Sequence, residues 1–407
     1  SIPDMQDAWE VVAITSYFPG CCRVDTKGAY DMKFHLFIYA TLGRRHELEA
    51  GMAGKRPELY QRMLDEVAEY VQFADEVGYA GFGHPEHHLQ IEGFEASNEP
   101  GLLSMWIGQH SKKLRVNMVG WVAPTHNPIR TAESIATLDH MLKGRLAVGM
   151  VRGYQTRWVH NFRIRTDLNA VGEWNRNSAE DDANREYFRE FVEIVLKAWK
   201  EDTFSYKGKY WTIPPDDFVN PHQQSVYTEY GTGVDENMHI REIGIAPKPY
   251  QDPHPPIYGG FTHSMRTALF WARYGGKPIV LASDLDFCQR LWAGYHDEAL
   301  KHGHDVQQGD EAAWGGAMIC HTNKTTAQEW LTDPMWMWDK WFTPFGQGHP
   351  ELLVGDPDSI SRRIEEASKK FPIKECFLLI PQGIHEREQI MSSLDLFANK
   401  VMPRFAD

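Results

Sequence analysis

Apolar residues along the chain follow two patterns that alternate with each other. Short runs of consecutive apolar residues are typical of buried strands, whereas longer segments with an apolar residue at every third or fourth position are typical of amphipathic helices. The short runs predict eight strands, at Lys33–Thr41, Ala80–His84, Leu114–Val122, Arg145–Val151, Ile257–Gly260, Pro278–Ala282, Ala313–Cys320 and Glu375–Ile380.

Helices are predicted between most of these strands. The clearest is Pro57–Val77, which is followed by Gly78, a residue suited to the end of a helix. The others are Gly101–His110, Pro128–Leu142, Asn184–Lys200, Ser264–Tyr274, Asp286–His302, Pro357–Lys370 and Ile384–Val401. Because a helix between two strands carries the chain back over the sheet, the strands should be parallel. Eight such units predict an α/β protein of the (β/α)₈ TIM-barrel class.

An open, doubly wound sheet is the alternative architecture, since it also alternates strands with helices. The chain has no Gly-x-Gly-x-x-Gly after a predicted strand and no Gly-x-x-x-x-Gly-Lys-Ser/Thr. The absence of both phosphate-binding motifs weakens this alternative. We therefore expect one barrel domain over residues 32–407, preceded by an N-terminal extension at residues 1–31.

An insertion at residues 322–355 follows the seventh predicted strand. It contains Asp333–Phe342, a stretch rich in Met and Trp. This stretch is either a mobile lid over a pocket for an apolar or aromatic substrate, or a helix packed on the barrel. Residues 154–182, in contrast, are polar and predict a loop.

Charge and cysteine content narrow the choice of partners and compartment. Lys and Arg number 42 against 56 Asp and Glu, so the formal net charge is −14, which disfavours nucleic acid and anionic membranes. No apolar run approaches the roughly 20 residues that a membrane span needs. The five cysteines form no Cys-x-x-Cys pair, and the first residues do not form a secretory signal. We expect a cytoplasmic protein without nucleic-acid or membrane partners.

The end of the second predicted strand carries a cluster of ionisable residues. Active sites of such barrels lie at the carboxyl ends of the strands, and His84, Glu86, His87 and His88 follow one another there. Their spacing matches neither zinc-protease helix motif, and Pro85 breaks a helix. A metal site is therefore the weaker interpretation, beside an acid/base histidine and a purely structural histidine pair.

Two further strand ends carry residues suited to an anion. Arg152 follows the fourth strand, and an arginine there can grip an anion with its planar guanidinium group. Gly260 and Ser264 precede a predicted helix, whose N-terminus offers free N–H groups to a phosphate. Taken together, these positions describe a phosphate cradle. Gly120, inside the apolar third strand, indicates either a bulge, a close approach by a ligand, or simple packing relief.

At these residues the sequence resembles the bacterial luciferase-like flavin-dependent monooxygenases, in particular the luciferase α subunit. The similarity runs from Met32 to Pro403. It is carried by Met32–Phe34, Glu86–His88, Pro124–Glu133, Leu138–Arg145, Val151–Gly153, Leu394–Phe397 and Val401–Pro403, in the same order and at similar spacing. The resemblance implies a barrel with an insertion after the seventh strand, a homodimer, and reduced FMN supplied by a separate NAD(P)H:flavin reductase.

The resemblance also implies roles for individual residues. Arg152 matches the phosphate-binding arginine, and Ser264 and Thr267 match the phosphate-binding hydroxyls. Val119–Gly120 matches a position that often carries a non-prolyl cis peptide bond against the flavin. His87 matches the acid/base histidine, and His88 matches its neighbour.

Three positions depart from the family pattern. Val151 replaces a reactive cysteine that is dispensable in the family. Asn127 replaces a histidine, although His126 is adjacent to it. His263 replaces an acidic residue beside the phosphate-binding serine. These changes argue against aldehyde oxidation with light emission and leave flavin binding intact.

The leading hypothesis is therefore a two-component monooxygenase. Reduced FMN would react with O₂ to form a C4a-peroxyflavin, which oxygenates a small apolar or aromatic substrate. His87 would donate or accept a proton, and Glu86 would orient a histidine. The alternatives are a deazaflavin (F420)-dependent hydride-transfer oxidoreductase, a metal-dependent barrel hydrolase built on His84, Glu86 and His88, and a flavin-binding protein without catalysis.

Overall fold

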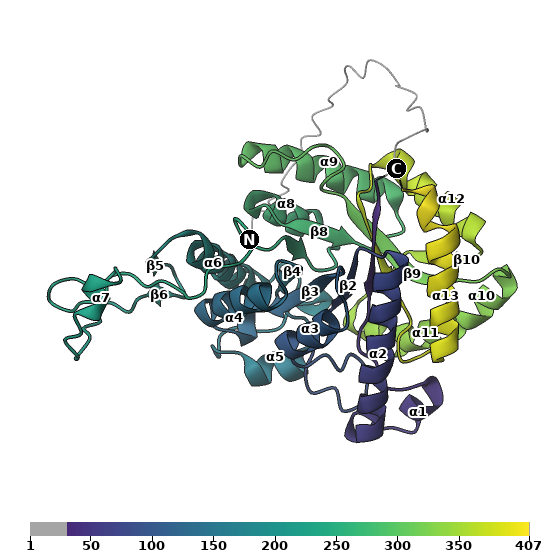
Figure 1. The fold of residues 1–407 in the computed structure, drawn as a ribbon, viewed down its shortest axis with the longest axis horizontal. Helices are drawn as coiled ribbons and strands as arrows, with labels where there is room; N and C mark the ends of the chain where they lie inside the picture. Colours follow the sequence, from purple (N-terminus) through teal and green to yellow (C-terminus); the bar gives the residue numbers. More distant parts are fainter. Residues whose placement is uncertain (1–30, 407) are drawn as a thin grey trace, which may run out of the picture.

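The computed structural model describes residues 31–406, and eight parallel strands close into a barrel at the centre of the molecule (Figure 1). The last strand pairs with the first, from Lys33 opposite Glu375 to Phe37 opposite Leu379. The strands are β1 (Lys33–Phe37), β2 (Gly81–His84), β3 (Arg115–Val122), β4 (Leu146–Val151), β7 (Ile257–Gly259), β8 (Lys277–Val280), β9 (Ala313–Cys320) and β11 (Glu375–Leu379). The predicted (β/α)₈ barrel is thus confirmed. The predicted N-terminal extension at 1–31 falls outside the described residues, apart from its last position.

Amphipathic helices surround the barrel. In α2 the buried face includes Met63, Val67 and Val71, and the helix ends at Gly78, whose φ of +93° favours glycine. The surrounding helices are α2 (Pro57–Val77), α3 (Pro100–Gln109), α4 (Pro128–Met141), α6 (Ala179–Lys200), α8 (Met265–Tyr274), α9 (Leu285–Lys301), α12 (Pro357–Lys370) and α13 (Arg387–Lys400). No helix within residues 31–406 is both long and apolar enough to cross a membrane.

Local structure departs from the predicted elements in several places. The first strand stops at Phe37 instead of Thr41, because the buried chain turns away and Ala40 adopts a positive φ. Helix α6 starts five residues before the predicted Asn184, since the Ser178 side chain caps it by accepting from Asp181 N. The predicted loop at 154–182 contains a short helix, α5 (Thr156–Phe162), and α1 (Arg45–Glu49) is a further helical turn that was not predicted.

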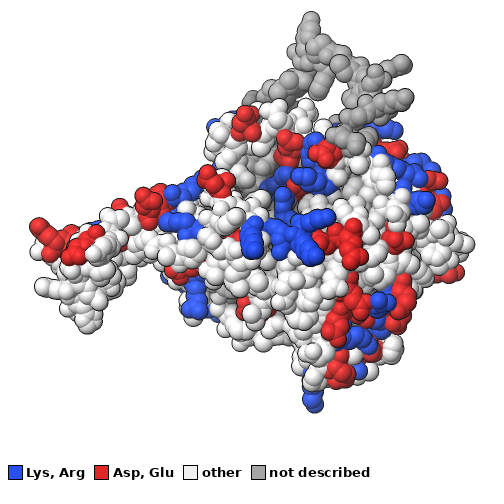
Figure 2. Space-filling view, in the orientation of Figure 1, with Lys and Arg blue, Asp and Glu red and all other residues white. Residues whose placement is uncertain are grey.

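Residues between α6 and β7 form a projection from the barrel (Figure 1). It contains β5 (Tyr206–Lys207), β6 (Thr212–Ile213) and α7 (Val226–Glu229), and its outer part is almost entirely exposed. Figure 2 shows acidic side chains at its far end, whereas lysines and arginines gather near the middle of the same face of the barrel. The net negative charge is therefore unevenly distributed.

The insertion after β9 is helical and returns to the sheet. It runs through α10 (Lys324–Trp330), α11 (Thr332–Met337), a π-helical turn at Trp338–Phe342 and a 3₁₀ turn at Thr343–Phe345. It then forms β10 (Leu352–Gly355), which pairs with the second half of β9, while the first half of β9 pairs with β8 and β11. Strand β10 was not predicted.

A buried polar cluster lies at the amino ends of the barrel strands, and we call it the floor cluster. It is centred on Glu375, which accepts a short hydrogen bond from the Tyr258 hydroxyl and lies 3.6 Å from Arg115 and 3.5 Å from Lys277. His35 Nε2 is 3.9 Å from the same carboxylate. Burial opposes ionisation of Glu375, but Lys277 and the other neighbours outweigh it and lower its pKa to about 2.

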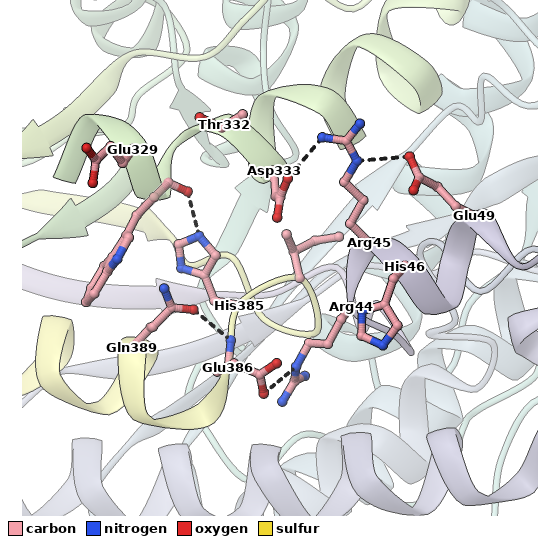
Figure 3. Close-up of a pocket in the computed structure, with 12 residues that line it drawn as sticks. Arg44, Arg45, His46, Glu49, Glu329, Thr332, Asp333, His385, Glu386 and Gln389 are labelled. Carbon is pink, nitrogen blue, oxygen red and sulfur yellow. Dashed lines mark hydrogen bonds and ion pairs between the residues drawn. The ribbon is translucent and has the colours of Figure 1, made fainter. Parts of the chain in front are cut away.

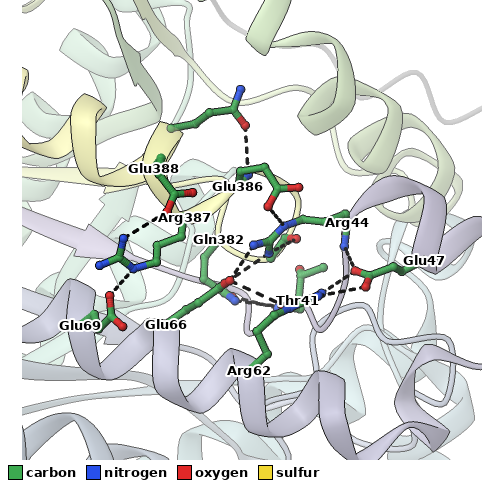
Figure 4. A network of polar contacts seen from close by, with 12 residues as sticks. Thr41, Arg44, Glu47, Arg62, Glu66, Glu69, Gln382, Glu386, Arg387 and Glu388 are labelled. Atoms are coloured by element: carbon green, nitrogen blue, oxygen red, sulfur yellow. Dashed lines mark hydrogen bonds and ion pairs between the residues drawn. The ribbon is translucent and has the colours of Figure 1, made fainter.

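A second polar network joins the first and last units of the barrel (Figure 4). Arg44, after β1, donates to Glu66 of α2 at 2.6 Å and to Glu386 at the start of α13 at 3.0 Å. The Thr41 amide donates to the Gln382 side chain, which donates in turn to the Thr41 carbonyl, both at 3.0 Å. These contacts hold the loops after β1 and β11 together at the site end of the barrel.

Candidate functional site

Arg152 emerges from the end of β4 into a cluster of charged side chains. Its Nη1 donates to Asp181 Oδ1 at 2.6 Å, and the second oxygen of Asp181 lies 3.3 Å from Nε of Arg185. Burial lowers the pKa of Arg152, Asp181 partly offsets this effect, and nearby Arg266 lowers it further. Three arginines from β4, α6 and α8 thus share one place, and a single buried carboxylate lies between two of them.

The N-terminus of α8 forms the other side of this cluster. Ser264 caps the helix, with Oγ accepting from Thr267 N at 3.3 Å and donating to Thr267 Oγ1 at 3.0 Å. Arg266 pairs with Asp182 at 3.1 Å on the exposed rim, and His263 is also exposed. Helix N-termini attract anions, so the arginines and these hydroxyls together suit a phosphate group. We call this arrangement the arginine cradle.

A surface of small and aliphatic residues lies where β3, β4 and β7 end. The Val119–Gly120 peptide bond is cis. A Cβ on Gly260 would lie 2.8 Å from Val151 Cγ1 and 3.4 Å from Val119 Cγ1, so these three residues meet. A Cβ on Gly120 would lie 2.5 Å from the Gly149 carbonyl carbon, so only glycine allows the neighbouring strand to come this close. The register between β3 and β4 also shifts between Met118 and Trp121, which agrees with the bulge among the three alternatives for Gly120.

Glu86 binds two histidines on the loop side of the site. Its Oε1 accepts from His88 at 2.8 Å and from His126 at 2.7 Å, and its Oε2 accepts from Val122 N at 3.0 Å. Burial opposes ionisation of Glu86, but the hydrogen bonds from His126 and His88 outweigh it and lower its pKa to about 2. Glu86 therefore orients His88 and His126 rather than His87.

His84 does not join these residues. Its ring nitrogens lie 3.0 Å from the Pro85 carbonyl and 3.0 Å from Ser104 Oγ, and burial lowers its pKa to about 4. Among residues 31–406 no three His, Cys, Asp or Glu side chains are grouped to hold a metal ion. The set of His84, Glu86 and His88 proposed for a metal hydrolase is therefore not assembled.

His87 points to a different carboxylate. Its Nε2 is 3.3 Å from Oε1 of Glu95, while its Nδ1 is buried without a hydrogen-bond partner. Burial lowers the pKa of His87, and Glu95 and Glu86 counteract part of that shift. The ring is therefore neutral near pH 7, with one nitrogen facing a carboxylate and the other free to bind a further group.

The Met- and Trp-rich part of the insertion, residues 332–345, packs over the loops that carry His87 and Glu95. Trp341 stacks on Phe94 with ring centroids 5.0 Å apart, and Phe342 lies 4.8 Å from the ring of Tyr39. The Phe345 ring lies 5.3 Å from Tyr154. The segment is thus a helix packed on the barrel mouth, and its action as a lid stays a prediction.

A cavity of about 410 Å³ opens beside the insertion rather than inside the barrel mouth (Figure 3). Most of its charged side chains are engaged with one another: Arg45 contacts both Asp333 and Glu49, and Arg44 contacts Glu386. It is separate from both His87 and the arginine cradle.

The structure adds three site residues that the sequence did not reveal. Asp181 and Arg185 are four positions apart on α6, a spacing that would have identified them as an ion pair had the helix start been placed correctly. Glu95 lies in a loop and itself adopts a positive φ, and no sequence pattern identifies it as a site residue.

Comparison with known proteins agrees with this architecture. The sequence matches the family described as luciferase-like monooxygenase over residues 32–351, so the chain belongs to that family. It is 24% identical to 3,6-diketocamphane 1,6-monooxygenase of Pseudomonas putida, an alignment that spans 72% of this chain and 79% of the relative.

Solved structures that share the fold include two with different cofactors. One is the oxygenating constituent of 3,6-diketocamphane monooxygenase from Pseudomonas putida in complex with FMN, a type II Baeyer–Villiger monooxygenase; its TM-score is 0.67 at 18% identity, covering 92% of this chain and 98% of that one. The other is an F420-dependent secondary alcohol dehydrogenase, with a TM-score of 0.60 at 15% identity, covering 92% and 99%. The barrel thus occurs with both cofactors.

Proposed function

We propose that this protein is the oxygenase of a two-component system that uses reduced FMN and O₂ to oxygenate a small apolar or aromatic substrate. The observation that carries the proposal is the arginine cradle, which adjoins an aliphatic surface at the carboxyl ends of the barrel strands. A phosphate and a flat ring joined by a short chain require such a pair of sites. The FMN complex of the related oxygenating constituent supports FMN as the flavin.

The residues of this chain fit FMN. Arg152 and Arg185 carry two positive charges against the single negative charge of Asp181, so positive charge remains for a phosphate. Ser264 and Thr267 would add hydroxyl donors at the N-terminus of α8. The ring would lie against Val119, Gly120, Val151 and Gly260. When bound, reduced FMN would supply the electrons that activate O₂.

The protein itself would position the reactants and exclude water. The aromatic side chains of residues 332–345 cover the mouth and would bound an apolar substrate. His87, neutral and with an unpartnered Nδ1, would accept or return a proton at that nitrogen. His88 would act indirectly, since its Nε2 is engaged with Glu86.

The partners follow from this chemistry. A separate NAD(P)H:flavin reductase would supply the reduced flavin, and the description of the related structure as an oxygenating constituent supports this arrangement. We expect a homodimer in the cytoplasm. The described cysteines, Cys288, Cys320 and Cys376, are free and buried, which agrees with a reducing compartment.

Anaerobic titration with reduced FMN, reduced riboflavin and reduced F420 tests the cofactor. Arg152→Ala should weaken reduced FMN binding by about 1.5–3 kcal/mol, or roughly 10- to 100-fold, because a charged hydrogen bond is lost. The same variant should leave the weak binding of reduced riboflavin unchanged, since riboflavin has no phosphate. Arg273→Ala, at the far end of α8, is the matched control and should bind FMN normally.

Reaction with ¹⁸O₂ then tests catalysis. Reduced FMN, O₂ and a panel of apolar and aromatic compounds should give a product that carries one ¹⁸O atom. Tighter binding of F420, with oxygen-independent reduction of a substrate, would overturn the proposal in favour of hydride transfer. Flavin binding without any product across the panel would reduce the protein to a flavin carrier.

A further inference from the structure

Glu95 is a fully buried carboxylate at the barrel mouth, and four different side chains contact it. Tyr154 donates its hydroxyl at 3.2 Å, Gln155 donates its amide at 2.7 Å, and Trp341 donates its indole N–H at 2.6 Å. The fourth neighbour is His87, at 3.3 Å. Among the described residues Glu95 forms no ion pair with a lysine or arginine, so neutral donors and one imidazole stabilise its charge.

The contact with His87 indicates which ring nitrogen carries the proton. A carboxylate only accepts, so a neutral His87 should carry its proton on Nε2, which faces Glu95. The lone pair is then on Nδ1, the buried nitrogen without a partner. A carboxylate that fixes the tautomer of a catalytic imidazole is the arrangement found in the Ser-His-Asp triad of hydrolases.

The contact with Trp341 links this carboxylate to the insertion. Trp341 is in the π-helical turn and stacks on Phe94, which directly precedes Glu95. If residues 332–345 left the mouth, Glu95 would lose one of its three neutral donors. Its charge would then be less well compensated, and its attraction for a proton on His87 would increase.

We propose that Glu95 is a positioning residue that fixes His87 in the Nε2–H tautomer, and that Trp341 adjusts this interaction according to whether the insertion covers the mouth. The role of His87 itself rests on the monooxygenase proposed above. Closure of the insertion would thus make the imidazole a neutral acceptor at Nδ1, and opening would let it take up a proton more readily. The titratable groups near His87 are Glu95, Tyr154, Glu86 and His88.

NMR of protein with ¹⁵N-labelled histidine rings tests the proposal without flavin or substrate, and the His87→Gln spectrum assigns the His87 signals. Wild-type protein should show the Nε2–H tautomer. Glu95→Gln should lower the protonation midpoint of His87 by about 1–3 pH units, since an opposite charge within 4–6 Å is removed. Trp341→Phe keeps the ring stack but removes the indole N–H, so it should raise the midpoint.

Matched controls separate this effect from simple loss of packing. Glu92→Gln changes a carboxylate of the same loop that is exposed and paired with Arg157, and it should leave the midpoint unchanged. Trp336→Phe changes another tryptophan of the insertion that packs on Phe94, and it should also have no effect. Glu95→Asp, which keeps the charge, should restore part of the wild-type midpoint.

Kinetics provide the second readout. Glu95→Gln should lower kcat by about 10- to 100-fold, a part of what a positioned acid/base group contributes, and should leave reduced FMN affinity unchanged. An Nδ1–H tautomer in the wild type, or midpoint shifts of the same sign in Glu95→Gln and Trp341→Phe, would overturn the proposal. Correct NMR shifts in a protein that forms no oxygenated product would instead refute the monooxygenase and leave the tautomer assignment standing.

Discussion

The barrel contains two buried pairs of a glutamate and a histidine, one at each end. In the floor cluster, Glu375 is 3.9 Å from His35 and is surrounded by the cations Arg115 and Lys277. At the mouth, Glu95 is 3.3 Å from His87, and its other neighbours are uncharged donors. The same two residue types are therefore stabilised by cations at one end and by neutral hydrogen-bond donors at the other.

The difference follows from where the partners come from. The floor partners sit on β1, β3, β7, β8 and β11, whose positions are set by the strand ladders of the closed barrel. The partners of Glu95 come from the loop after β2, the segment after β4 and the insertion, none of which is fixed by the strand ladders of the barrel. A carboxylate held by strands contributes to stability, whereas one held by loops can respond to a ligand, as expected for the two faces of such a barrel.

Glu375→Gln should have the largest effect on stability of the variants that test this comparison. Removing one charge from a buried network leaves Arg115 and Lys277 uncompensated, and we expect the free energy of unfolding in urea to fall by about 3 kcal/mol. Reduced FMN affinity of the folded variant should not change. Glu95→Gln leaves no cation behind and should cost less stability while affecting turnover. Equal losses of stability in the two variants would show that the two ends do not differ as described.

The pH dependence of stability tests the role of the floor cluster. Burial lowers the pKa of His35 from 6.5 to about 4, so the unfolded chain binds a proton where the folded chain does not. Stability should therefore fall as the pH drops from about 6.5 to 4, by at most about 3 kcal/mol from this residue. His35→Gln should reduce that slope in urea titrations at several pH values. The lowered pKa of Glu375 adds a further loss only below about pH 4.5.

Arg45→Ala probes the outer edge of the insertion and should have the smallest effect. Arg45 pairs with Glu49 and Asp333 and lies over the ring of Trp336, but these contacts are exposed to solvent. Exposed ion pairs contribute little to stability, so the urea midpoint should stay the same. Limited proteolysis should nevertheless cut residues 321–351 faster. Unchanged cleavage would mean that this contact does not hold the insertion in place.

Much of the barrel could be predicted from sequence because its strands are buried apolar runs. Helices α2 and α12 begin and end at the predicted residues. Their starts are easy to predict because Pro57 and Pro357 mark their first turns. Strand β10 could not be found in this way. It has only four residues, and one of them, Leu352, is exposed, so its pairing with β9 depends on the fold rather than on local pattern.

The site divides in the same manner. Arg152 and Ser264 could be identified because each follows a predicted strand, and barrel topology brings neighbouring strand ends together. In the structure Arg152 lies near Arg266 of α8, the helix that Ser264 caps, while the roles of Arg152 and Ser264 stay predictions. Glu95 could not be identified, because its neighbours come from segments about 60 and 250 positions away in the chain. Its surroundings are created by tertiary contacts alone.

The first half of strand β9 pairs within the barrel, and its second half pairs with β10. Residues 321–351, which connect β9 to β10, therefore begin and end in one strand ladder. Residues 321–351 can therefore be replaced as one unit. Relatives could acquire a different mouth by exchanging this one stretch of sequence while the cradle and the floor cluster remain in place. For protein engineers, grafting at Cys320 and Leu352 offers a route to altered substrate range that leaves the barrel intact.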